Sequence, residues 1–293
     1  MTPAHWRVLL IYFAFTLAAT ALALARRWLR PGADGESVWS KYPSYLLLNL
    51  MFLIASWLPH AWHALTALLT ALGGLAAWEI TRALWPQARA LPLATIALVA
   101  AGGWLSQEGW LKAWLATLLA GIAANTWLGP RGDLGRRALA LAGSLVYVPL
   151  CLAAYLWTWQ ADSTGFRVVF LYLTVATNDA LAQITGQLFG ARQLAPHLSP
   201  AKTVEGALGG VLLAGAMGAA MSGVAGWSLP VGAVLGLVMG MAGLMGDLTA
   251  SAWKRALGLK NFSDLLGAQG GVLDRFDGLL FAAPVFYLLT VWR

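Results

Sequence analysis

Long apolar runs recur from one end of the sequence to the other, and short polar stretches separate them. A helix needs about 20 apolar residues to cross the hydrocarbon core of a membrane, and most of these runs have about 15 to 22. The pattern predicts an all-α, polytopic integral membrane protein with about nine or ten transmembrane helices. The expected segments are residues 6–25, 43–58, 62–81, 91–106, 110–128, 138–160, 166–187, 205–226, 229–249 and 278–292.

Composition agrees with a membrane protein. The chain of 293 residues is 59% hydrophobic and 11% charged, whereas soluble domains carry about 25% charged residues. The net charge of +7 fits cationic cytoplasmic loops better than a nucleic-acid partner, so we expect membrane lipids and no nucleic acid. The single cysteine, Cys151, lies in an apolar run and cannot form an internal disulfide.

The cations alternate along the chain and predict its orientation. If the N-terminus lies outside, 15 of the 19 lysines and arginines fall in inner loops, as the positive-inside rule requires. We therefore expect a bacterial inner-membrane protein whose charged C-terminal loops face the cytoplasm. The first run ends at Arg26 and Arg27, which is typical of an uncleaved helix rather than a signal peptide.

The sequence divides into two expected regions. Residues 1–165 are interpreted as an N-terminal transmembrane bundle, and residues 166–293 as a C-terminal region that carries the chemistry. The first region holds few charges inside its apolar runs. Glu79 is the exception, and a structural pair with Arg82 or a snorkelling side chain is the favoured interpretation over a role in a site.

Two polar clusters precede the last segments. Asp179 lies deep in an apolar run, where a carboxylate needs a metal, a proton or a partner, although a helix contact that involves Asn178 and Gln183 is the alternative. The stretch 196–206 can begin a helix capped by Ser199 or Thr203. Free backbone N–H groups at such a helix start, together with a lysine, favour an anion, whereas an ordinary capped loop is the simpler interpretation.

The third cluster, residues 246–278, interleaves acids, bases and glycines in an otherwise apolar chain. Asp274 and Asp277 are three residues apart and share a face of a helix. Together with Asp247 they suit Mg²⁺, while the cations of the segment suit phosphates. The pair Gly270-Gly271 allows a backbone to approach a phosphate, or makes a tight turn. A cationic loop with local ion pairs is the alternative.

The spacing of these residues resembles the CDP-diacylglycerol synthases, also called phosphatidate cytidylyltransferases. That family's signature is S-x-x-K-R-x4-K-D-x5-[PG]-x-H-G-G-x-x-D-R-x-D, and an upstream element is S-P-x-K-T-x-E-G-x-x-G-G. The first matches at Ser251, Lys254, Arg255, Lys260, Gly267, Gly270, Gly271, Asp274, Arg275 and Asp277, and the second at 199–210. Two positions depart from the pattern, because Asn261 replaces an aspartate and Gln269 replaces a histidine.

The resemblance implies transfer of CMP from CTP to a lipid phosphate, most simply phosphatidate, with release of pyrophosphate. It implies Mg²⁺, and leaves open a second divalent ion or a monovalent cation. The implied roles are catalytic for Asp247, Asp274, Lys254 and Arg275; metal-binding for Asp247, Asp274, Asp277 and Asp179; and substrate-binding for Ser199, Lys202, Thr203, Glu205, Ser251, Arg255, Lys260, Gln269, Gly270 and Gly271.

Other readings stay open at this point. One is a cytidylyltransferase that acts on a different lipid phosphate, such as a prenyl phosphate. Another is a non-catalytic protein that binds or transports lipid phosphates. The oligomeric state, a homodimer included, is not decided by the sequence.

Overall fold

The computed structural model describes most of the chain. The described residues are 2–29, 46–47, 49–55, 61–85, 90–105, 108–116, 119, 134–162, 164–266 and 270–291. The expected segments 43–58 and 110–128 therefore lie partly outside the described residues.

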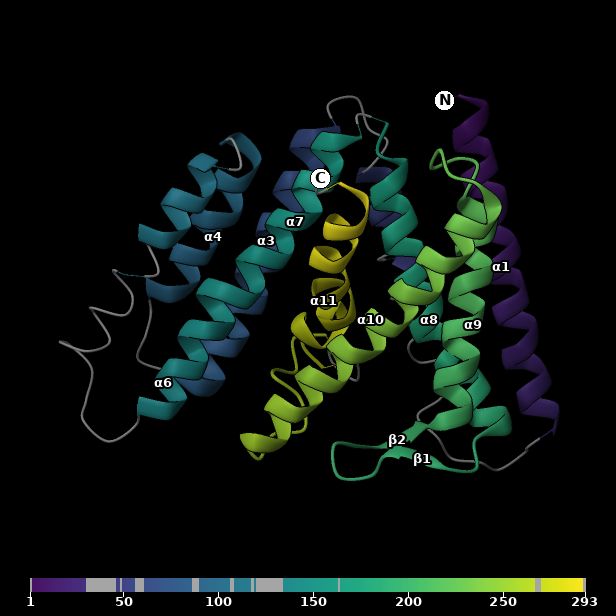
Figure 1. Cartoon of the computed structure of the whole chain (residues 1–293). Coiled ribbons are helices and arrows are strands. Elements are labelled where there is room, and N and C mark those ends of the chain that lie inside the picture. Colours follow the sequence, from purple (N-terminus) through teal and green to yellow (C-terminus); the bar gives the residue numbers. More distant parts are fainter. Residues whose placement is uncertain are drawn as a thin grey trace. The chain divides into compact units, whose positions relative to one another are not determined.

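The described chain is mainly helical, as the apolar runs predict (Figure 1). The helices are α1 (Pro3–Leu29), α3 (Ala61–Leu84), α4 (Ala90–Trp104), α6 (Leu134–Leu141), η1 (Ala142–Tyr147), α7 (Val148–Ala161), α8 (Phe166–Phe189), α9 (Val204–Met221), α10 (Leu229–Ala256) and α11 (Leu273–Thr290). By length and composition, six helical stretches of the described residues are apolar enough to cross a membrane: Pro3–Ala25, His63–Leu84, Arg137–Ala161, Phe166–Phe189, Val204–Met221 and Leu229–Ala256.

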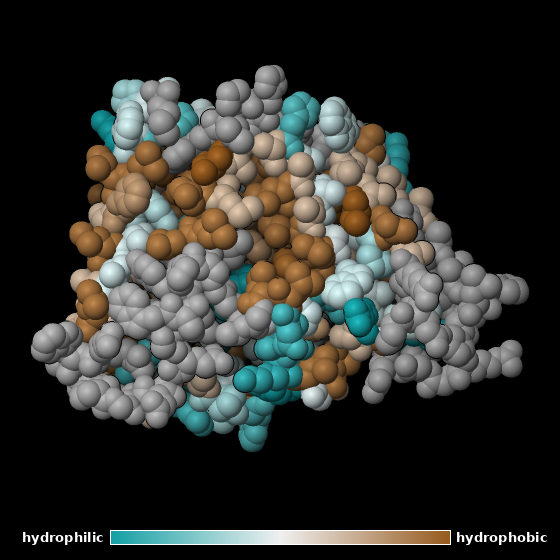
Figure 2. Space-filling view, turned by 180° about the vertical axis from the view of Figure 1, so that it is seen from behind, coloured by the Kyte–Doolittle hydropathy of each residue, from teal (hydrophilic) through white to brown (hydrophobic). Residues whose placement is uncertain are grey.

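Large apolar side chains remain exposed on these helices, and Figure 2 shows them spread over the visible face. Leu10 and Leu17 of α1 are about 70% exposed, and Leu212 of α9 is 65% exposed. Apolar surface on this scale is rare in a soluble monomer. The exposed faces are therefore those of an integral membrane protein in contact with lipid.

The chain divides into two compact units. The first unit comprises Met1–Leu50 and Thr164–Ala252, and the second comprises Met51–Ser163 and Trp253–Arg293. Each unit combines an N-terminal with a C-terminal stretch, whereas the sequence suggested one boundary at residue 165. Hydropathy locates helices but does not indicate which helices pack together.

The first unit depends on close helix packing. In this unit α8 and α9 run side by side, and α1 packs against both (Figure 1). A Cβ atom built on Gly206 would lie 2.7 Å from the carbonyl oxygen of Ala182, and one on Gly236 would lie 3.0 Å from the Cα of Gly218. The glycine-rich pattern therefore serves helix contact, which is the common use of small residues in membrane helices.

Between α8 and α9 the chain forms a short hairpin. Strands β1 (Gln193–Ala195) and β2 (Ser199–Thr203) pair antiparallel, with Ala195 opposite Ser199. This hairpin corrects the all-α expectation in one place. Its strands are short and contain Pro200, so their sequence carries no strand pattern.

The second unit packs α3, α4 and α11 against a continuous α6–η1–α7 stretch. The π-helical turn η1 changes the backbone pairing, and nearby side chains bind its carbonyl groups. Thr95 donates to the carbonyl oxygen of Ser144, and the hydroxyl oxygens of Thr81 and Ser144 lie 2.8 Å apart. π-Helical turns of this kind are rare, and here the turn packs against α3.

Candidate functional site

Helix α10 is longer than its apolar run. The run ends near residue 249, but the helix continues to Ala256. Asp247, Ser251 and Lys254 are separated by four and three residues, so they lie on one face of this helix. Half of the charged segment is thus helical rather than a loop.

The first unit contains a cluster centred on Asp247 near the end of α10. The Lys202 ammonium on β2 donates to Oδ2 of Asp247, and the Ser251 hydroxyl donates to Oδ1 at 3.4 Å. The two side chains of the ion pair are 23% and 31% exposed, in that order. The structure therefore brings together three predicted site residues from two separate motifs, and leaves their charged groups accessible to water.

The start of α9 is fixed by one of the two capping residues that the sequence offered, Ser199 and Thr203. Thr203 is the N-cap, and its hydroxyl accepts from the backbone N–H of Gly206 at 3.1 Å. Glu205 turns to the preceding loop, where its carboxylate accepts from the backbone N–H groups of Ala191 and Arg192. Both residues thus fix the hairpin that carries Lys202, and Ser199 lies in the same hairpin.

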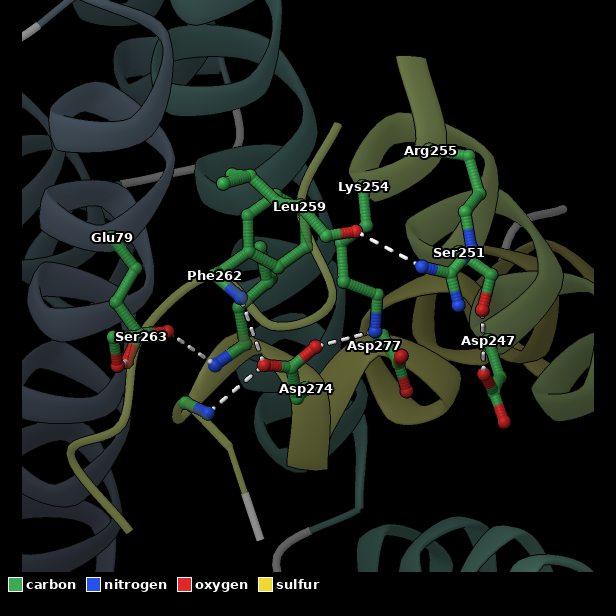
Figure 3. A network of polar contacts seen from close by, with 12 residues as sticks. Glu79, Asp247, Ser251, Lys254, Arg255, Leu259, Phe262, Ser263, Asp274 and Asp277 are labelled. Atoms are coloured by element: carbon green, nitrogen blue, oxygen red, sulfur yellow. Dashed lines mark hydrogen bonds and ion pairs between the residues drawn. The ribbon is translucent and has the colours of Figure 1, made fainter. Parts of the chain in front are cut away.

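The second unit contains a cluster centred on Asp274 in the first turn of α11. Lys254 donates to Oδ1 of Asp274 at 2.5 Å, and the backbone N–H groups of Phe262 and Gly271 donate to Oδ2 at 3.1 and 2.9 Å (Figure 3). The Asp274 side chain is only 7% exposed, and that of Lys254 is 12% exposed. Asp274 therefore holds the loop before α11 as well as facing a catalytic candidate.

Glu79 of α3 belongs to the same cluster, and the interpretation of this residue from the sequence is wrong. It is fully buried and therefore does not snorkel. Its carboxylate accepts from the hydroxyl of Ser263 and from the backbone N–H groups of Val272 and Leu273 at 2.6 to 2.8 Å. Arg82 instead lies over the ring of Trp78, 5.0 Å from its centroid.

The remaining cations and acids of the segment have varied surroundings. Arg255 is exposed and donates to the carbonyl oxygen of Leu259, and Lys260 is exposed. Arg275 lies in the first turn of α11 and is partly buried. Asp277 is 3% exposed, and Tyr147 of η1 donates to its carbonyl oxygen at 3.3 Å. Gln269 lies outside the described residues.

The neighbouring residues Asn178 and Asp179 of α8 lie at a helix crossing in the first unit. Asn178 is 2% exposed, and its Oδ1 atom has no hydrogen-bond partner among the described residues. A Cβ atom on Gly210 of α9 would lie 2.9 Å from that oxygen, and one on Gly240 of α10 would lie 3.5 Å from it. Asn178 therefore packs into the small-residue contact of three helices, and Asp179 beside it is only partly buried.

The carboxylates can be compared with the requirements of a metal site. Among the described residues, no group of three or more His, Cys, Asp or Glu side chains is gathered in a way that could hold a metal ion. Asp247 has one oxygen bound only by a serine hydroxyl at 3.4 Å. Asp274 has one oxygen bound by two backbone N–H groups and the other by Lys254. Carboxylate oxygens are the ligands that Mg²⁺ prefers, and Asp247 has the more available ones.

Comparison with known proteins agrees with the positions of these clusters. The model of the cytidylyltransferase family matches residues 40–292, which include both of them. The chain belongs to this family. The matched range thus includes the residues that form the Lys202–Asp247 and Lys254–Asp274 pairs.

Several curated relatives are about a third to two fifths identical to the chain over the part that aligns. The phosphatidate cytidylyltransferase of Aquifex aeolicus (strain VF5) is 39% identical over 149 residues, which are 50% of this chain and 54% of that protein. The phosphatidate cytidylyltransferase of Brucella abortus biovar 1 (strain 9-941) is 41% identical over 129 residues, 42% of this chain and 47% of that protein. The one of Synechocystis sp. (strain ATCC 27184 / PCC 6803 / Kazusa) is 41% identical over 132 residues, 44% of each. The chain thus spans about half the length of the curated relatives it matches.

Proposed function

We propose that the protein transfers CMP from CTP to a lipid phosphate, most simply phosphatidate, and forms a CDP-lipid and pyrophosphate. The observation that carries this proposal is the pairing of two lysines at signature positions with aspartates, Lys202 with Asp247 and Lys254 with Asp274. Family membership and the names of the relatives support the same reaction.

The reaction needs charge neutralisation more than proton transfer. An oxygen of the lipid phosphate attacks the α-phosphorus of CTP, and the bond from that phosphorus to the bridging oxygen of the β-phosphate breaks. The electron pair of this bond leaves with pyrophosphate. Because the attacking oxygen is already anionic near neutral pH, no strong general base is required. The main barrier is the repulsion between two polyanions, which fixed cations reduce.

Lysine residues supply such cations in both clusters. Lys202 is 23% exposed and paired with an aspartate of similar exposure. An arriving triphosphate would compete with Asp247 for its ammonium group, because charge-assisted hydrogen bonds to phosphate are strong. Lys254, Arg255 and Arg275 would act in the same way on the phosphates, while Ser251 holds the Asp247 carboxylate.

Mg²⁺ fits the donor chemistry of this proposal. We infer that Asp247 is its main ligand, because its carboxylate is about a third exposed and is held by side chains alone. Asp274 could contribute only Oδ1, since its other oxygen is bound by two backbone N–H groups. Asp277 and Asp179 remain predicted assisting ligands. The bound ion would neutralise charge on the triphosphate and on the pyrophosphate that leaves.

The proposed reaction takes place at the cytoplasmic side of the bacterial inner membrane. Lys254, Arg255 and Lys260 lie at or just beyond the end of α10, as the positive-inside rule expects of cytoplasmic ends. CTP would reach this end from water, and the lipid phosphate from the bilayer.

The proposal is tested with purified full-length protein in detergent. Labelled CTP, Mg²⁺ and one of three acceptors (phosphatidate, lysophosphatidate or a prenyl phosphate) are supplied, and pyrophosphate and the CDP-lipid are both measured. We expect equal amounts of the two products with phosphatidate. Reactions that lack the lipid or contain a chelator serve as controls.

The pattern of products separates the alternatives. Turnover with the prenyl phosphate alone would keep the chemistry but change the acceptor. If the folded protein bound phosphatidate but turned over no acceptor, the proposed enzymatic activity would be refuted, and a protein that only binds lipid phosphates would be favoured.

A further inference from the structure

The buried carboxylate of Glu79 is the strongest feature that the proposed reaction does not use. It comes from α3, whereas its partners Ser263, Val272 and Leu273 come from the loop before α11 and from its start. Three hydrogen bonds to this one side chain therefore connect parts of the chain that are more than 180 residues apart in sequence. We propose that Glu79 is a positioning residue that fixes Asp274 for the reaction proposed above, on which this inference rests.

The carboxylate satisfies the start of helix α11. The first backbone N–H groups of a helix have no partner inside the helix and carry partial positive charge. Residue 272, the N-cap, has no side-chain capping bond of its own. Glu79 Oε1 accepts from Val272 N–H and Oε2 from Leu273 N–H, both at 2.8 Å. A remote carboxylate thus performs the capping that the local sequence does not supply.

The glycine pair allows this contact. A Cβ atom on Gly271 would lie 2.6 Å from each carboxylate oxygen of Glu79, which is closer than real atoms come. Gly270 has a φ of +81°, which favours glycine. The backbone N–H of Gly271 donates to Asp274 (Figure 3). The turn therefore accommodates the carboxylates of Glu79 and Asp274. These carboxylates bind the backbone N–H groups of Gly271, Val272 and Leu273, so these groups are not presented to a phosphate.

These contacts connect Glu79 to a catalytic candidate. Asp274 lies one residue after Leu273, and its Oδ2 atom binds the same turn at Gly271 while its Oδ1 atom binds Lys254. A shift in the turn would move the Asp274 carboxylate and the Lys254 ammonium together. Glu79 acts only through these residues, so its loss should lower the rate of the chemical step rather than the binding of either substrate.

The decisive variant is Glu79→Gln, which keeps the shape of the side chain but turns an NH₂ group toward one of the backbone N–H groups. The matched control is Glu108→Gln, because Glu108 lies in the same unit and is 77% exposed, paired only with Lys112 four residues on. We expect kcat of Glu79→Gln to fall roughly 10- to 100-fold, the range that a small displacement of a catalytic group produces. KM for CTP and for phosphatidate should stay within about two-fold, since the Glu79 carboxylate is buried and bound by protein groups.

Rates are measured per folded molecule, well below the midpoint of thermal unfolding, so that lost stability does not imitate lost catalysis. A purely structural role would lower the unfolding midpoint and leave kcat of the folded protein unchanged, and that result would overturn the proposal. Wild-type protein without turnover would instead refute the proposed function itself, and this inference with it.

A second set of variants tests the contact independently. Gly271→Ala should lower kcat strongly, because its methyl group collides with the Glu79 carboxylate. Adding Gly271→Ala to Glu79→Ala should lower kcat little further than Glu79→Ala alone. The carboxylate that the new methyl group would meet is then absent, and the effects of coupled residues are not additive. If the two substitutions instead lowered kcat independently, so that their fold-losses multiplied in the double variant, the proposed coupling would be contradicted.

Discussion

Asp247 and Asp274 have the same predicted role but different surroundings. Asp247 is 31% exposed and is held by two flexible side chains. Asp274 is 7% exposed and holds two backbone N–H groups together with a buried lysine. At the residue scale, the first has the properties of a ligand-binding carboxylate, and the second has a structural role in addition to its predicted catalytic one.

This difference leads to a prediction for two matched substitutions. Asp247→Asn should reduce kcat/KM by about 100-fold or more if it binds the metal, yet cost at most about 1 kcal/mol of stability, since exposed ion pairs contribute little. Asp274→Asn should abolish turnover and also destabilise the second unit by roughly 3–5 kcal/mol, because it leaves Lys254 buried without its partner. Thermal unfolding in detergent and steady-state kinetics on the same samples measure both effects. Equal stability losses for the two variants would contradict this distinction.

The sequence predicted most of these residues, and the reason it missed one is physical. Charged residues in an apolar chain stand out, and the resemblance to the family's signature then implied roles for the lysines and aspartates among them. Glu79 also stood out as a buried acid, but its nearest cation in sequence, Arg82, suggested a local pair. The true partners are backbone N–H groups of α11, and no side-chain pattern reveals such partners.

At the scale of single elements, hydropathy located the helices better than it located their ends. The charged residues that end an apolar run do not end a helix. Thus α10 continues to Ala256 and α11 begins at Leu273, five residues before the expected segment. The helical extensions carry Ser251, Lys254 and Asp274, which are held more rigidly than loop residues would be. The hairpin between α8 and α9 lacked any periodic signal.

The packing of α9 on α10 gives a prediction at this scale. A Cβ atom on Gly236 would collide with the carbonyl oxygen of Ala214, whereas one on Gly223 would meet nothing within 4 Å. Because backbone atoms cannot move aside as side chains do, Gly236→Ala should destabilise the protein by about 1–3 kcal/mol. Gly223→Ala, the matched control, should change stability by less than about 0.5 kcal/mol. Unfolding in mixed micelles compares the two, and a tolerant Gly236 would show that the helices are not packed this closely.

At the scale of the whole molecule, each unit supports the alternation of helix ends on which the predicted topology depends. In the first unit, His5 contacts Phe166 with ring centroids 5.1 Å apart, and Arg167 lies over Trp227 at 5.4 Å, so three predicted outer ends lie together. In the second unit, Trp157 contacts Tyr287 at 5.5 Å.

The predicted inner ends lie together in the second unit as well. Arg137, at the start of the α6–η1–α7 stretch, lies over the ring of Trp85 just after α3, 5.7 Å from its centroid. Glu79 joins the end of α3 to the start of α11. In each unit, described helix ends that the cation pattern assigns to the same side therefore lie together, and a labelling experiment can determine which side of the membrane they face.

The two ends of α10 provide the test of that orientation. The helix has 28 residues, so it is about 42 Å long and exceeds the hydrocarbon core of about 30 Å. Ser228 precedes it and Lys260 follows it, and both are exposed.

The native Cys151 is buried, so single cysteines can be introduced after Cys151→Ala with little background. In intact cells an impermeant maleimide should label Ser228→Cys and not Lys260→Cys, whereas permeabilised cells should label both. If intact cells labelled only Lys260→Cys, the orientation would be the reverse of the predicted one. The Lys254–Asp274 cluster would then lie on the side of the membrane where CTP is absent, and the proposed reaction would be refuted together with the orientation.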